Sequence, residues 1–103
     1  MASNIDYTSP STNFTHDLNR SNFFQKDAQN YINVLGENQL NTLENTSLLD
    51  IYLSTGNVVE PHIHQNATEL VYCISGFAVV SLLNPFTNQI LNLPIKPGQV
   101  ANI

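Results

Sequence analysis

The stretch GNVVEPHIHQNATELVYCISG, residues 56–76, places two histidines and a glutamate between framing glycines. Written as a pattern it is G-x5-H-x-H-x4-E-x6-G, in which the polar fixed positions are His62, His64 and Glu69. Two imidazoles and one carboxylate therefore fall within eight residues. At average residue usage the joint pattern arises by chance on the order of once in 10^5 chains of this length. The pattern predicts a mononuclear metal site.

The spacing of these three residues suits metal binding from neighbouring strands. Successive side chains of a strand alternate between its faces, so His62 and His64 are expected on the same side. Residues 65–67 are enough to turn the chain, which lets Glu69 contribute an oxygen from the next strand. If Glu69 faces the interior, Val71, Cys73 and Ser75 face it as well. Imidazoles with a carboxylate suit several transition metals, and the hard carboxylate with open positions favours Mn(II) or Fe(II).

The composition restricts the partners that the chain can have. The 103 residues suffice for one small domain, and 42% of them are apolar. Only 11% are charged, the net charge is -5, and the basic residues are Arg20, Lys26 and Lys96. Three scattered cations do not form a phosphate-binding surface, so we expect no nucleic acid partner and no binding to an anionic membrane.

The sequence gives no sign of export or of membrane insertion. Residues 1–18 lack both the basic and the apolar region of a signal peptide, and no apolar run reaches membrane-spanning length. The single cysteine, Cys73, excludes an intrachain disulfide. We therefore expect a cytoplasmic protein.

The first part of the chain is expected to form little regular structure. Residues 1–26 are rich in Asn, Ser and Thr, which predicts a polar N-terminal arm, extended or disordered. Its aromatic residues Phe14, Phe23 and Phe24 are expected to dock on this core, the alternative being a partner subunit. Residues 27–36 fit either a short helix or a strand, and their β-branched residues favour a strand that ends at Gly36.

From residue 48 onward, short apolar segments alternate with turn residues, which indicates an all-β sandwich or barrel over residues 27–103. A half-buried strand is expected over 48–54, with Leu49, Ile51 and Leu53 facing inward. Residues 69–75 and 77–83 predict a tight hairpin joined at Gly76 and buried on both faces. The remaining expected elements are strands over 57–63 and 89–95, a loop over 84–88, a turn over 96–98 and the start of a strand over 99–103.

The 56–76 pattern resembles the first conserved motif of the cupin superfamily and matches it at every fixed position. It is especially similar to the germin-like and oxalate decarboxylase-like cupins. The resemblance implies an antiparallel β-barrel or jelly roll with an irregular N-terminal arm. It also implies that His62, His64 and Glu69 are metal ligands, with Mn(II) as the metal and Fe(II) or Zn(II) as the alternatives.

The chain departs from the family pattern at the second motif, G-x5-P-x-G-x2-H-x3-N, whose histidine is the fourth ligand. Gly98 resembles the first glycine of that motif, residues 99–103 follow it, and no histidine occurs after His64. We therefore expect a truncated cupin domain, incomplete at its C-terminus and part of a longer cupin. The alternative is a short cupin that a partner chain completes. Either an open barrel edge or the N-terminal arm is expected to support a homo-oligomer.

The function implied by the resemblance is that of a metal-binding cupin acting on a small carboxylate such as oxalate, as a decarboxylase or oxidase. No catalytic acid or base is assigned. The alternatives are a non-catalytic cupin binding module and an Fe(II) dioxygenase-type cupin. The scarcity of Lys and Arg argues against a phosphorylated substrate. Whether this chain is an enzyme stays open, because it lacks the fourth ligand.

Overall fold

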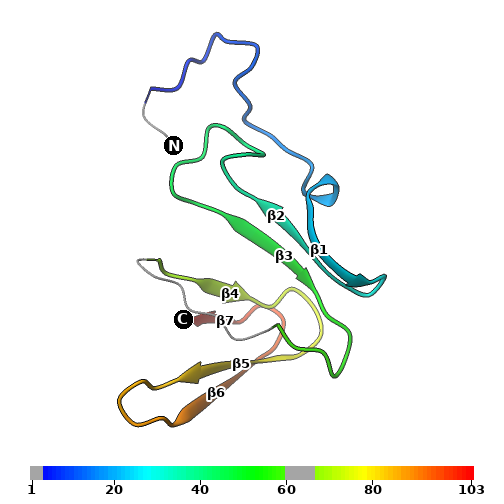
Figure 1. Cartoon of the computed structure of the whole chain (residues 1–103), viewed down its shortest axis with the longest axis vertical. Helices are drawn as coiled ribbons and strands as arrows, with labels where there is room; N and C mark the ends of the chain where they lie inside the picture. Colours follow the sequence, from blue (N-terminus) through cyan, green and yellow to red (C-terminus); the bar gives the residue numbers. More distant parts are fainter. Residues whose placement is uncertain (1–3, 60–66) are drawn as a thin grey trace. The chain divides into compact units, whose positions relative to one another are not determined.

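Short antiparallel strands make up nearly all the regular structure of the chain (Figure 1). The computed structural model describes residues 4–59 and 67–103. In these two ranges the one helix is the three-residue 3-10 helix η1, and no helix is long and apolar enough to cross a membrane. The prediction of an all-β fold is confirmed. The elements are η1 (Leu18–Arg20), β1 (Asn22–Asp27), β2 (Asn30–Leu35), β3 (Leu48–Tyr52), β4 (Leu70–Tyr72), β5 (Ala78–Leu83), β6 (Ile90–Ile95) and β7 (Val100–Asn102).

The strands divide between two units, residues 1–60 and residues 61–103. In the first unit β1, β2 and β3 form one antiparallel sheet in that order. In the second unit β4 pairs with β7 and β5 pairs with β6, both antiparallel. The boundary expected at residue 26 falls inside β1, so the end of the expected arm contributes a strand to the first sheet.

Residues 4–17, which precede η1, are irregular and are held by hydrogen bonds to the loop between β2 and β3. The N–H of Asn13 donates to Oδ1 of Asn41 at 2.9 Å, and its carbonyl accepts from Oγ1 of Thr42 at 2.7 Å. Phe14 stacks on Tyr7 with ring centroids 5.6 Å apart. Polar side chains of the loop between β2 and β3 therefore satisfy backbone groups of the segment that was expected to be extended or disordered.

A buried amide joins the β1–β2 turn to the segment after β3. Asn30 is 4% exposed, and its Nδ2 donates to Oδ1 of Asp27 and to Oγ of Ser54, both at 2.9 Å. Its Oδ1 accepts from the N–H of Ser54 at 2.9 Å. The hydrogen bond from Asn30, followed by one from the N–H of Gln29, lowers the pKa of Asp27 below its ordinary value. The side chain of Asn30 thus adds to its backbone pairing with Asp27 and links this end of the sheet to Ser54.

We expect Asn30→Ala to lower the free energy of unfolding by about 1–3 kcal/mol, because it removes the hydrogen bonds that a buried amide makes to Asp27 and Ser54. Urea unfolding followed by circular dichroism measures this effect. Asn38→Ala, at an exposed turn position, is the matched control. Equal urea midpoints for the two variants would contradict a stabilising role for the Asn30 amide.

The prediction that residues 69–75 and 77–83 form a hairpin is wrong. The two segments do form strands, but β4 pairs with β7 and β5 pairs with β6. Between them Gly76 has φ +78°, a conformation that glycine adopts without strain. The chain changes direction there without joining the two strands in one ladder.

The loop after β5 is richer in turn-forming residues than the segment around Gly76. This loop closes the hairpin formed by β5 and β6. The N–H of Asn84 donates to the carbonyl of Gln89 at 2.8 Å. Oδ1 of Asn84 accepts from the N–H of Phe86 at 2.9 Å, and Asn88 adopts φ +57°. Asparagine favours both the local side-chain bond and the left-handed conformation. The predicted loop over 84–88 therefore determines which strand is the partner of β5.

The second unit has a small apolar core on one face of its strands. Cys73, Ile95 and Ala101 are 4–7% exposed, and three half-buried residues pack against them, namely Val71, Val80 and Leu93. The alternate residues of the same segment, Leu70, Tyr72 and Ile74, are 61–74% exposed. The expectation that this segment is buried on both faces is therefore wrong.

In the first sheet, too, residues that were expected to be buried are exposed. The strand expected over 48–54 is present as β3, but Leu49, Ile51 and Leu53 are 37–47% exposed instead of facing a core. The strand expected over 57–63 is not formed by residues 57–59, and the rest of it lies outside the described residues.

Candidate metal centre

The predicted ligand set belongs entirely to the second unit, residues 61–103. His62 and His64 lie outside the described residues, so the structure places one member of the set, Glu69. The position of Glu69 is set by β4, which begins at the next residue, Leu70.

Glu69 directly precedes β4 and extends its ladder with β7. Its N–H donates to the carbonyl of Ile103 at 3.1 Å, and its carbonyl accepts from the N–H of Ile103 at 2.9 Å. Because side chains alternate along a paired strand, Glu69 lies on the same face as Val71 and Cys73. Val71 and Glu69 are half-buried and Cys73 is buried. Glu69 is therefore on the covered face of the β4–β7 pair, together with Val71 and Cys73, as the alternation of side chains predicted.

The residues that follow on this face are suited to packing. Sγ of Cys73 lies 3.5 Å from the carbonyl of Ser75, which it can use as a weak acceptor. Cys73 belongs to the core with Ile95 and Ala101, as expected for a free cysteine acting as a small apolar residue. Ser75 itself is exposed, so the face expected to run from Glu69 to Ser75 ends at Cys73.

The described residues offer no alternative metal set. Over residues 4–59 and 67–103, no group of three or more His, Cys, Asp or Glu side chains is close enough to hold an ion. The histidine within these ranges is His16, whose Nε2 lies 2.5 Å from Oγ of Ser21 in the first unit. The candidate centre therefore depends on His62 and His64 together with Glu69.

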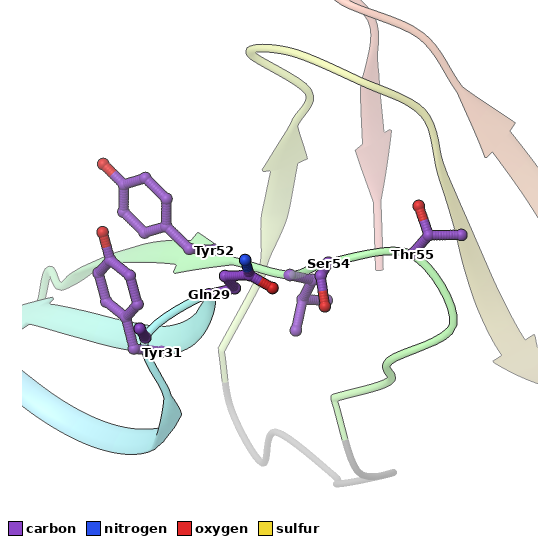
Figure 2. Close-up of a pocket in the computed structure, with 7 residues that line it drawn as sticks. Gln29, Tyr31, Tyr52, Ser54 and Thr55 are labelled. Carbon is purple, nitrogen blue, oxygen red and sulfur yellow. The ribbon is translucent and has the colours of Figure 1, made fainter.

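A second feature, which the sequence reasoning missed, is a shallow groove of about 550 Å³ in the first unit (Figure 2). Tyr31 of β2 and Tyr52 of β3 line it and stack on each other. The other lining residues are Ala28, Gln29, Leu53, Ser54 and Thr55, none of which is charged. The two tyrosines are far apart in sequence, and only the register of β2 on β3 brings them together.

The chain belongs to the cupin family, since the family model described as Cupin matches residues 16–103. The match includes the 56–76 pattern, the second unit and residues 16–60 of the first unit. Searches of curated proteins and of solved structures gave no match.

Proposed function

We propose that this cupin binds one divalent transition-metal ion through His62, His64 and Glu69, and that the ion is Mn(II). The observation that carries the proposal is the G-x5-H-x-H-x4-E-x6-G pattern in a chain that belongs to the cupin family. The donor chemistry fits, because two imidazole nitrogens and a carboxylate oxygen suit Mn(II) and leave coordination positions for other ligands. The half-buried place of Glu69 beside Val71 and Cys73 supports the same assignment.

We further propose that the substrate is a small carboxylate such as oxalate, as in the cupins that the pattern resembles. A metal ion at this set would act as a Lewis acid that binds and polarises a substrate carboxylate. The chain has three basic residues, and only Lys96 lies in the second unit. With so few cationic side chains, recognition of a substrate anion depends on the metal set, which disfavours phosphorylated substrates.

The proposal is tested by the metal content and the activity of the purified chain. After expression with Mn, Fe and Zn supplied together, we expect about one Mn per chain by mass spectrometry of the metals, because a mononuclear set binds a single ion. Oxalate is then added across acid to neutral pH, and CO2 and hydrogen peroxide are measured.

The outcomes separate the candidate functions. Mn binding with release of CO2 or peroxide supports the full proposal. Mn binding without turnover supports the metal site and leaves a binding module, whereas a stoichiometric Fe content would replace Mn(II) by the dioxygenase-type alternative. Glu69→Gln should lower the metal content, and Glu44→Gln, in the first unit, is the control. Equal metal content in the two variants would contradict the role of Glu69.

A further inference from the structure

Two tyrosines of the first sheet lie directly opposite each other on neighbouring strands. Tyr31 of β2 is the register partner of Tyr52 of β3. Their ring centroids are 4.4 Å apart and the rings are inclined by 15°, which is a stacked arrangement. Figure 2 shows the rings side by side with both hydroxyl groups pointing the same way. Backbone pairing and ring stacking together hold the two phenols in contact.

An acidic side chain stands beside this pair. Asp50 precedes Tyr52 by two residues in β3, so the two side chains share a face of the sheet. A hydrogen bond with Asp50, and then the negative charge of Asp50, raise the pKa of Tyr52. A phenol that loses an electron must also release its proton. The Asp50 carboxylate is a proton acceptor already in place for that step.

The pair is also accessible. Tyr52 is 40% exposed, Tyr31 is half-buried, and both border the groove of about 550 Å³. An oxidant in solution can therefore reach at least one ring. The other two tyrosines of the chain, Tyr7 and Tyr72, are 65% and 61% exposed, but the ring stacked on Tyr7 is that of Phe14.

We propose that Tyr31 and Tyr52 are a site of oxidative cross-linking, at which a one-electron oxidant of the peroxidase or photosensitiser class joins the rings as dityrosine. Each phenol loses one electron to the oxidant and one proton, with Asp50 accepting the proton of Tyr52. The two phenoxyl radicals couple through a carbon–carbon bond between positions ortho to the hydroxyls. The hydrogen on each coupled carbon then moves to the oxygen, which restores both phenols. In total, two oxidant equivalents are reduced and two protons are released.

The bond would fasten β2 covalently to β3, the strand that leads into residues 53–59. The cross-link is intramolecular because the partners are already paired by the register of the sheet. Its formation is therefore independent of protein concentration, whereas coupling of exposed tyrosines on different chains rises with concentration.

The test uses the full chain in dilute solution with photoexcited ruthenium tris-bipyridyl and persulfate as the one-electron oxidant. We expect dityrosine fluorescence in a monomer whose mass has fallen by two hydrogen atoms. Digestion after glutamate separates the two tyrosines, since Glu37 and Glu44 lie between them. A peptide that still joins the two segments identifies the cross-link.

Phenylalanine variants retain the rings and remove the phenols one at a time. Tyr31→Phe and Tyr52→Phe should each abolish the monomeric product, whereas Tyr7→Phe and Tyr72→Phe should leave its yield unchanged. Asp50→Asn should slow the reaction while the product remains the same. Cross-linked dimers alone, a peptide joined through Tyr7 or Tyr72, or an undiminished yield in Tyr52→Phe would overturn the proposal.

Discussion

Replacing His62 and His64 together by alanine should weaken Mn(II) binding by at least about 100-fold, because even residues that merely orient a metal ligand typically contribute 10–100-fold to affinity. Removing both imidazoles leaves Glu69 as the single proposed ligand, and one carboxylate competes poorly with water for a divalent ion. The measurement is isothermal titration of the metal-stripped chain with Mn(II), together with the metal content after purification.

The control for this experiment is His16→Ala. His16 lies in the first unit, where its ring contacts Ser21, and it has no place in the proposed set. We expect its removal to leave Mn(II) affinity unchanged. If the double variant binds Mn(II) as tightly as the natural chain, or if His16→Ala lowers affinity equally, the assignment of His62 and His64 fails. A cooperative urea transition retained by the double variant would show that loss of metal is not loss of fold.

Ile95→Ala should be the most destabilising apolar truncation in the second unit, by about 2–5 kcal/mol in the free energy of unfolding. Ile95 is 4% exposed, the lowest value among the three buried apolar residues of this core. Truncation removes apolar contacts with Cys73 and Ala101 and leaves a cavity between two pairs of strands. Such a cost is a large fraction of the stability of a small domain.

Two variants of the same strand make the measurement specific. Ile90→Ala, at a position that is 64% exposed, should change the free energy of unfolding by no more than about 0.5 kcal/mol. Ile95→Val, which removes one methylene, should cost about 0.5–1.5 kcal/mol. Urea unfolding monitored by circular dichroism compares the three variants. Equal effects of Ile95→Ala and Ile90→Ala would mean that the small core does not stabilise this unit.

The alternation of side chains along strands predicted much of the local structure. The strand over 89–95 and the start of one after residue 98 are present as β6 and β7, and the turn residues at 84–88 close a hairpin. The grouping of Glu69 with Val71 and Cys73 also followed from alternation. These features depend on neighbouring residues, whose propensities and turn chemistry are readable from sequence.

The pairing of strands could not be read in the same way. Leu70 is the register partner of Asn102, more than thirty positions further along the chain. The local sequence around Leu70 does not indicate that β7 is its partner strand. Period two tells which side chains share a face, but not which strand lies alongside. The apolar run through residues 69–83 therefore predicts one hairpin, although β4 pairs with β7 and β5 pairs with β6. The Tyr31–Tyr52 contact escaped prediction for the same reason.

The two backbone hydrogen bonds between Glu69 and Ile103 would bear on the metal selectivity of the proposed site. A carboxylate on a free loop can shift to suit ions of different radius, whereas the main chain of Glu69 is fixed on both its N–H and its carbonyl side. If Glu69 is a ligand as proposed, its backbone is preorganised, and metal binding would lose less conformational entropy at this donor. A ligand carried on such a rigid backbone should discriminate between ions by size and preferred bond length more sharply than the donor atoms alone would.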